Sequence, residues 1–348
     1  MLTYFRIIFA LVLLASGIAC SNDVELNAPA INKLVVYSIL NPDADIQYVR
    51  VSKVFLPEGN ALDFASANDP GLNRDQVIVT LNGVVLRDTT LSRQAGVFPA
   101  GLKVFYCTNA DLDIVPGQTY TLDVQYLADA TANVKAYTRV PQTPDIVSPF
   151  SPTFAGGVLI RNTEVQFENT VKITFRRTPN AAAYESKVVV QYLENGNPRT
   201  SVFGPKLFVS NNRCTEQSAN NLCYGFERRE LIDYLGGPQV GGNLYGIIDT
   251  PITKPVNVSL PIEPQRDGLN NSVYLSITAI DTFFYQYLAA NNANSSTLAT
   301  SVLEYSNVEN GLGILGSVCA KGLYVDFTQC GKYLLRYNNT PRPAGRCE

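Results

Sequence analysis

Cysteine offers the clearest chemistry in this sequence, because the chain contains no histidine and no tryptophan. Its seven cysteines lie at positions 20, 107, 214, 223, 319, 330 and 347. Leaving Cys20 aside, the other six could form three disulfides. We predict a bridge only between Cys214 and Cys223, which flank a short polar loop. The thiols without an assigned partner are Cys107, Cys319, Cys330 and Cys347. Structural zinc prefers closely spaced Cys or His pairs, which these positions lack, so disulfides are favoured over a metal.

The absence of histidine removes the usual general base and the commonest metal ligand. An enzyme built from this chain would need paired carboxylates, a Ser-Lys dyad or a carboxylate-bound metal. Asp43 and Asp45, in the run Asn41–Asp45, are the nearest approach to a calcium-like cluster. Asn, Pro and Asp also form tight turns between strands, and the turn is favoured. We therefore predict no catalytic residue, no metal and no cofactor.

The charges are sparse and balanced. There are 27 basic and 30 acidic side chains, with a formal net charge of −3. Because no basic stripe is present to neutralise phosphates, nucleic acid is not an expected partner. Charged residues make up only 16% of the chain, while Asn, Thr, Ser and Tyr are plentiful. This composition favours half-buried strands and polar loops, and so an all-β fold.

The first twenty residues have the anatomy of an export signal. Ile7–Ala15 is an unbroken apolar run that is shorter than the roughly 20 residues a membrane-spanning helix needs. The following Ser16–Cys20 resembles a lipobox, with a small residue before the cysteine, although Gly17 stands where Leu is usual. The alternative is an ordinary secretory signal with a cysteine there by chance. We predict that residues 1–19 are a lipoprotein signal peptide and that Cys20 carries acyl chains, each buried methylene contributing about 0.8 kcal/mol.

Residues 20–32 form a polar tether in this interpretation. Asp23 and Glu25, close to the predicted anchor, resemble the acidic surface-export signals of some bacterial lipoproteins. The expected location is therefore a membrane outside the cytoplasm, with a lipid anchor at Cys20. Facing the cell surface is favoured over facing the periplasm.

Residues 33–141 are expected to form an N-terminal β-sandwich of immunoglobulin-like type. The strand segments are 33–40, 46–55, 76–81, 84–91, 103–107, 118–127 and 133–140. Asn82-Gly83 predicts a type I′ hairpin, since both central positions of that turn need positive φ. Pro116-Gly117 ahead of Tyr120 is typical of immunoglobulin-like sandwiches that carry a tyrosine early in a late strand. The irregular segment Leu56–Asp75 is either an interaction loop or a disordered one.

A Pro-rich linker is predicted at 142–152, followed by a C-terminal β-rich domain at 153–330 and a cysteine-containing tail at 331–348. The fold class is thus all-β, with tandem immunoglobulin-like sandwiches and one or two short helices in the second. Its strand segments are 171–175, 184–193, 255–262, 271–280 and 323–328. Helices are predicted at 227–235 and at 282–291, the latter capped by Asp281. Phe284, Tyr287 and Leu288 share one face of the second helix, which indicates core packing more than a binding site.

Several segments together resemble the family of Bacteroidota outer-membrane lipoproteins known as domain of unknown function 4249 (DUF4249). The resemblance rests on five parts of the sequence. They are Cys20, residues 34–40, residues 116–122 together with 138–141, residues 273–288 and residues 306–316. The last is the most specific. Its Asn310, Gly311, Leu312, Gly313 and Gly316 match an Asn-Gly-Leu-Gly-x-Phe-Gly signature, with Leu315 in place of Phe. These glycines lack the strand-loop-helix context of a phosphate loop, so positive φ or close strand approach is favoured.

The resemblance implies a limited role, because the family has no established activity. Its members look like outer-membrane lipoproteins encoded beside TonB-dependent transporters. By analogy, we expect a non-catalytic binding or accessory protein, with a membrane anchor, a transporter partner and a ligand of unknown identity. A structural spacer or assembly partner at the cell envelope is the alternative, and a histidine-independent hydrolase is a third class.

Overall fold

The computed structural model describes residues 33–54, 70–92, 101–148, 170–194, 197–210, 220–227, 230, 273–294 and 305–325. These residues form strands arranged in three sheets, together with one long helix, α5 (Thr282–Asn294), and one short 3-10 helix, η2 (Ala130–Ala132). The first eight strands are β1 (Leu34–Leu40), β2 (Ile46–Lys53), β3 (Val77–Leu81), β4 (Val84–Val85), β5 (Arg87–Ser92), β6 (Gly101–Thr108), β7 (Thr119–Tyr126) and β8 (Val134–Arg139). The chain continues with β9 (Asp145–Ser148), β10 (Thr170–Arg176), β11 (Ala183–Glu194), β12 (Asn197–Phe208), β13 (Asn221–Glu227), β14 (Val273–Ile280) and β15 (Leu312–Val325).

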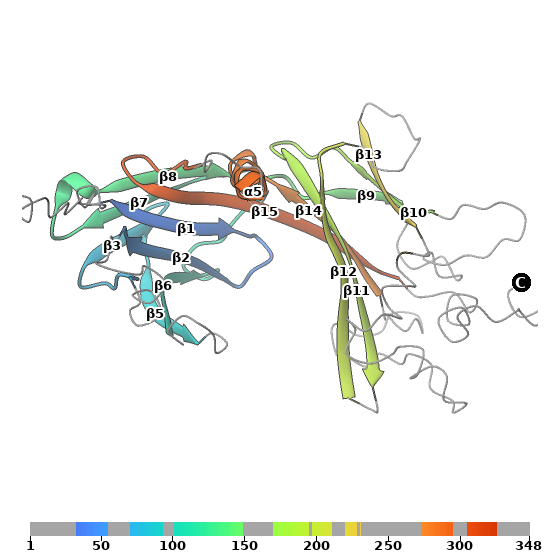
Figure 1. Ribbon diagram of the computed structural model, residues 1–348, viewed down its shortest axis with the longest axis horizontal. Helices are drawn as coiled ribbons and strands as arrows, with labels where there is room; N and C mark the ends of the chain where they lie inside the picture. The colour runs from blue at the N-terminus through green and yellow to red at the C-terminus, as the bar shows by residue number, and fades with distance from the viewer. Residues whose placement is uncertain are drawn as a thin grey trace, which may run out of the picture.

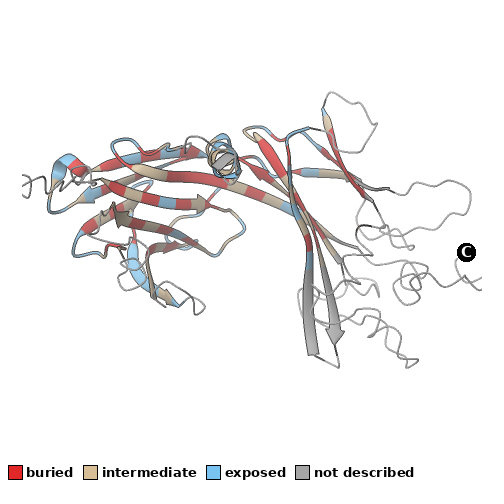
Figure 2. Ribbon diagram, viewed as in Figure 1, coloured by how far each residue is buried: buried red, intermediate tan, exposed pale blue. Residues whose placement is uncertain are grey.

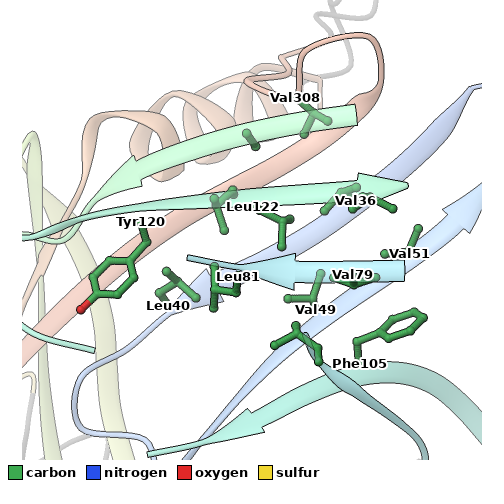
Figure 3. Packing of buried hydrophobic residues seen from close by; sticks show 14 of the residues in the cluster. Val36, Leu40, Val49, Val51, Val79, Leu81, Phe105, Tyr120, Leu122 and Val308 are labelled. Atoms are coloured by element: carbon green, nitrogen blue, oxygen red, sulfur yellow. The ribbon is translucent and has the colours of Figure 1, made fainter. Parts of the chain in front are cut away.

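The N-terminal sandwich packs β1, β2, β6 and β5 against the sheet β4-β3-β7-β8 (Figure 1). Its strands alternate buried and exposed residues, because successive side chains point to opposite faces of a sheet (Figure 2). Figure 3 shows the two inner faces meeting, with Val36, Leu40, Val49 and Val51 on one side and Val79, Leu81 and Leu122 on the other. Each fully buried aliphatic side chain of this kind contributes roughly 1.5–3 kcal/mol to folding.

The C-terminal sandwich packs the strands β12, β11, β14 and β15 against the sheet β13-β10-β9. Aromatic rings dominate this second core. The Phe175 ring lies 4.8 Å from the Tyr184 ring, and the Phe208 ring lies 4.8 Å from the Tyr224 ring, measured between centroids. Phe226 is also fully buried here. Aromatic pairs at such distances add about 0.5–1.5 kcal/mol beyond the area they bury.

Strand β15 belongs to both sandwiches. Its first half, from Leu312 to Ser317, pairs in parallel with β1, and its second half, from Val318 to Val325, pairs antiparallel with β14. The result is one continuous eight-stranded sheet in the order β12-β11-β14-β15-β1-β2-β6-β5. Figure 1 shows β15 running from the N-terminal sandwich into the C-terminal one. A segment near residue 315 therefore completes a sandwich that otherwise comes from residues 34–139.

The all-β fold class is confirmed, and so are several local predictions. Asn82 and Gly83 have φ of 50° and 87°, as a type I′ hairpin requires. Tyr120 forms the expected tyrosine corner: its hydroxyl accepts from the Val115 N–H at 2.7 Å and donates to the Asp113 carbonyl at 3.0 Å. Helix α5 begins one residue after Asp281, as predicted.

Other boundaries differ from the sequence predictions. The predicted strand 84–91 is split at the buried Leu86, where the chain leaves one sheet as β4 and joins the other as β5. Strand β9 forms inside the segment predicted as a Pro-rich linker, and β12 and β13 were not predicted. Glu227 ends β13 instead of beginning a helix; in the rest of 227–235 only Glu230 is described, and it is helical. The terminal strand begins at Leu312, before the predicted 323. The predicted strand 255–262 lies outside the described residues.

Two glycines of the signature lie so close to β1 that a side chain would not fit without a shift of its neighbours. Gly313 has a φ of 103°, and a Cβ there would lie 2.0 Å from the Val36 carbonyl oxygen on β1. A Cβ on Gly311 would lie 2.7 Å from Cγ1 of Val134 and 3.0 Å from the Leu34 carbonyl oxygen. Close strand approach, the interpretation favoured over a phosphate loop, is confirmed at both positions.

We expect Gly313→Ala to destabilise the protein far more than Gly83→Ala. Both glycines have positive φ, which costs an alanine about 1–2 kcal/mol. At Gly83 a Cβ would meet nothing within 4 Å, whereas at Gly313 it would force β15 away from β1. Urea unfolding of the mature chain should show an extra loss of about 1–3 kcal/mol or more for Gly313→Ala. Equal losses for the two variants would contradict this account of the β1–β15 pairing.

Candidate functional site

Helix α5 is fixed at its N-terminus by Asp281. The Phe284 N–H donates to Asp281 Oδ1 at 2.7 Å, and the Tyr285 N–H donates to the Asp281 carbonyl at 3.1 Å. An N-cap carboxylate satisfies a backbone donor that a helix start leaves unpaired, and it also interacts favourably with the helix dipole. The predicted capping role of Asp281 is therefore confirmed.

The second carboxylate oxygen of Asp281 ties three distant segments together. Thr138 Oγ1 on β8 donates to Asp281 Oδ2, and Ser317 Oγ on β15 donates to the same oxygen at 3.2 Å. The Asp281 N–H in turn donates to the Ser317 carbonyl at 3.1 Å. All three side chains are buried, with exposed fractions of 2% or less. This cluster, which we call the Asp281 junction, lies where the two sandwiches meet.

Burial raises the pKa of Asp281, because the carboxylate loses hydration that its neighbours only partly replace. The hydrogen bonds from Thr138, Phe284 and Ser317 act in the opposite direction, since they favour the charged form. Tyr305 faces the same region, and its pKa is raised first by burial and then by the charge of Asp281. Burial of the charged Asp281 carboxylate in the junction therefore costs electrostatic free energy.

Beyond its N-terminus, α5 lies against the outer side of β15. A Cβ on Gly316 would lie 2.7 Å from Cβ of Phe284, so the glycine leaves the space that the helix occupies. Phe284, Tyr287 and Leu288, the predicted apolar stripe, are all half-buried. Phe284 packs inward, while Tyr287 lies at a margin of the helix and contacts Tyr37 of β1, with ring centroids 5.9 Å apart. The stripe thus serves packing and also leaves aromatic surface exposed.

Tyrosines continue from α5 across the outer face of the eight-stranded sheet. Tyr48 of β2 and Tyr106 of β6 are direct register partners and share a face. Tyr37 is paired with Arg50, two residues beyond Tyr48, so it points to the same side. Tyr37 is 44% exposed and Tyr48 is 38% exposed, while Tyr106 and Tyr287 are half-buried. We call Tyr287, Tyr37, Tyr48 and Tyr106 the tyrosine row.

An arginine closes the row at its β5 end. The Arg87 guanidinium lies 4.9 Å from the centroid of the Tyr106 ring, which is a cation–π contact. Arg87 also forms an ion pair with Asp111. The pKa of Asp111 is lowered, first by hydrogen bonds from Thr108 and further by Arg87. At the β5 end of the row, the charges of Arg87 and Asp111 thus offset each other, and their ion pair holds the guanidinium beside Tyr106.

The residues of the family signature link the two sheets of the N-terminal sandwich. The Asn307 side chain accepts from the Leu315 N–H at 3.0 Å and donates to the Leu315 carbonyl at 2.8 Å, like a neighbouring strand. Asn310 donates to the Thr131 and Asn133 carbonyls at 2.6 and 2.9 Å. Leu312 begins β15, and Leu315 is fully buried in the core. The contacts of these signature residues therefore hold the fold together.

The Asn41–Asp45 segment is a turn. The Asp43 N–H donates to the Asn41 side chain at 3.0 Å, and the Ala44 N–H donates to the Asn41 carbonyl at 3.1 Å. Gln47 completes it by donating to the carbonyls of Asn41 and Ala44. The backbone reason for these residue types is confirmed. Among the described residues, no group of three or more Cys, Asp or Glu is placed to hold a metal ion.

The structure describes three of the seven cysteines, Cys107, Cys223 and Cys319. Cys107 and Cys319, which had no assigned partner, are buried free thiols of the N-terminal core, so the three disulfides that six thiols could form are not all present. Burial raises the pKa of both, and Cys319 donates to Thr143 Oγ1 at 3.4 Å. Cys223 is buried on β13, but Cys214 lies outside the described residues, as do Cys20, Cys330 and Cys347. The Cys214–Cys223 bridge stays a prediction.

The loop Leu56–Asp75 is described only from residue 70 onward. The Leu72 N–H donates to the Val51 carbonyl at 2.9 Å, and the Leu72 side chain is buried in the core. The last residues of this segment are therefore fastened to β2. The rest of the predicted interaction loop lies outside the described residues.

The sequence model of the family described as Domain of unknown function (DUF4249) matches residues 22–321. The chain belongs to this family. The match begins just after Cys20 and ends within β15, so the DUF4249 region includes both sandwiches and the Asp281 junction. A comparison with curated proteins finds no match. Within the described residues, no helix has the length and apolar character to cross a bilayer.

Asp281→Asn should change how stability depends on pH. A carboxyl whose pKa is raised by folding contributes stability that is fully present below its ordinary value near 3.8 and is lost as the pH rises through the raised value. The free energy of unfolding of the wild type should therefore fall, relative to Asp281→Asn, as the pH rises from about 4 toward neutrality. Urea unfolding across that range measures it, with exposed Asp45→Asn as control. Parallel curves for wild type and Asp281→Asn would refute the assignment.

Proposed function

We propose that the protein is a non-catalytic binding or accessory lipoprotein, anchored through Cys20 to the outer membrane and associated with a TonB-dependent nutrient transporter. The observation that carries the binding role is the tyrosine row. Tyrosine side chains, with an apolar ring and a polar tip, are enriched at binding surfaces, and Tyr37 and Tyr48 of the row are exposed. Surface-facing orientation is part of the proposal.

The anchor rests on the sequence of the first twenty residues. An apolar run, a small residue and then Cys20 provide the substrate pattern for lipidation. More than one acyl chain is needed for stable anchoring, and a lipidated cysteine with an acylated amino group satisfies that need. A spacer role would use the same continuous sheet, but it would not require tyrosines on its outer face.

Cys20→Ala should release the protein from membranes. The variant loses the thioether and its acyl chains, so the mature chain should appear in the soluble fraction and take up no labelled fatty acid. Fractionation of labelled cells measures both effects, with Cys107→Ala as a cysteine control that should remain in membranes. A Cys20→Ala protein that stays membrane-bound and labelled like the parent would disprove the anchor.

The transporter association is tested by mild detergent extraction of the lipidated protein from native membranes. We expect a transporter to copurify in a fixed ratio. Recovery of the protein alone, with no ligand-induced rise in Tm across glycan and peptide panels, would count against the binding role.

A further inference from the structure

We infer that the Asn82-Gly83 turn is a site of spontaneous covalent modification, at which Asn82 loses its side-chain amide and becomes aspartate or isoaspartate. The other Asn-Gly pair among the described residues, Asn310-Gly311, is protected by its hydrogen bonds. A third pair, at 195–196, lies outside the described residues. The reaction needs only water, so the site is independent of the lipid anchor and of the proposed binding role.

The reaction begins at the backbone nitrogen that follows the asparagine. The Gly83 nitrogen gives its proton to solvent and attacks Cγ of Asn82. A C–N bond forms, the bond from Cγ to the side-chain nitrogen breaks, and that nitrogen leaves as ammonia. Water then opens the resulting five-membered imide ring. Opening at Cγ gives aspartate, whereas opening at the main-chain carbon gives isoaspartate, in which the chain runs through Cβ and Cγ. Glycine obstructs the attack least, because it has no Cβ.

The two described Asn-Gly pairs are alike in exposure and in backbone conformation. Both asparagines are exposed, and both have positive φ, 50° at Asn82 and 60° at Asn310. Neither property therefore separates the two pairs. What differs is how firmly the structure holds the two nitrogens that take part, the leaving amide nitrogen and the attacking glycine nitrogen.

Both nitrogens are held at the Asn310-Gly311 pair. The Asn310 amide donates to the Thr131 carbonyl at 2.6 Å and to the Asn133 carbonyl at 2.9 Å. The Gly311 N–H donates to the Val308 carbonyl at 3.3 Å, and Gly311 is buried. The Asn310 side chain cannot turn toward the Gly311 nitrogen unless it first gives up its own two hydrogen bonds.

The corresponding nitrogens of the Asn82-Gly83 pair have no such restraint. No described residue accepts a hydrogen bond from the Asn82 amide or from the Gly83 N–H, and a Cβ on Gly83 would meet nothing within 4 Å. The Asn82 backbone N–H donates to the Thr121 carbonyl at 2.7 Å, but that nitrogen takes no part in the reaction. Beyond the turn, the chain is held by β4, a strand of two residues. So short a strand opens at low cost, and opening lets Cγ of Asn82 reach the Gly83 nitrogen.

Isoaspartate at position 82 would disturb the passage of the chain from one sheet to the other. Its extra methylene lengthens a turn whose two-residue length fixes the register of β3 with β4. Leu86 follows β4 directly, is buried at the crossover to β5, and donates its N–H to the Val79 carbonyl at 2.8 Å. We expect the Leu86 amide to exchange with solvent faster in the modified protein.

Peptide mapping of the purified, folded protein after prolonged incubation at mildly alkaline pH tests the inference, with isoaspartate detected by enzymatic methylation. We expect aspartate and isoaspartate to form at position 82 about tenfold or more faster than at position 310, since each hydrogen bond that must break lowers the reactive population by about twofold to tenfold. The same incubation in urea removes the structure, so the rates at the two positions should then become similar.

Asn82→Gly is the matched control variant, because Gly-Gly also forms a type I′ turn and has no amide to lose. It should give no product at position 82, and the exchange rate of its Leu86 amide should be the same before and after incubation. In the wild type, that rate should rise as the product accumulates. Hydrogen exchange of fresh and incubated samples of both proteins measures this effect.

Four results would overturn the inference. The first is no product at position 82 in the folded protein, and the second is equal rates at positions 82 and 310 in the folded protein. The third is a rate difference that persists in urea, because it would come from the neighbouring sequence and not from the hydrogen bonds of Asn310 and Gly311. The fourth is unchanged Leu86 exchange in the modified wild type, which would refute the effect on the crossover.

Discussion

The parallel pairing of β1 with β15 is the constraint on which the rest of the structure depends. It joins residue 35 to residue 312 and thereby closes a loop that includes almost the whole described chain. Closing so long a loop is entropically costly, and it is offset by the fully buried Val36, Ile314 and Leu315 on the paired strands. Without β15, β1 would be an exposed edge of the N-terminal sandwich, and the eight-stranded sheet would not be continuous.

Two polar side chains make this pairing specific. Asn307 occupies the backbone donor and acceptor of Leu315, and Asp281 joins β15 to β8 through Ser317 and Thr138. Both fix the position of β15 relative to the four-stranded sheet. Because Asp281 also caps α5, the same carboxylate sets where the helix starts, and the helix in turn places Tyr287 beside Tyr37. The tyrosine row is thus held by contacts that lie beneath it.

The sequence predicted what is local. The Asn82-Gly83 turn, the tyrosine corner at Tyr120 and the Asp281 cap each depend on a few neighbouring residues, and each was predicted correctly. The pairing of β15 with β1 could not be predicted, because a glycine-rich run has no alternating apolar pattern and its partner lies far away in the chain. The tyrosine row was missed for the same reason. Tyr37 and Tyr48 were on correctly predicted strands, but only the register between β1, β2 and β6 puts them on one face.

The Asp281 junction also shows why a shifted pKa is here a structural feature. Buried carboxyls with raised pKa values are common at catalytic sites, where a free oxygen is needed to take or give a proton. In Asp281, Oδ1 accepts from the Phe284 N–H and Oδ2 accepts from the hydroxyls of Thr138 and Ser317. With 2% of the residue exposed, a substrate would have to displace β8 or β15 to reach it. The buried charge of Asp281 therefore serves to join the two sandwiches, through its hydrogen bonds to β8 and β15.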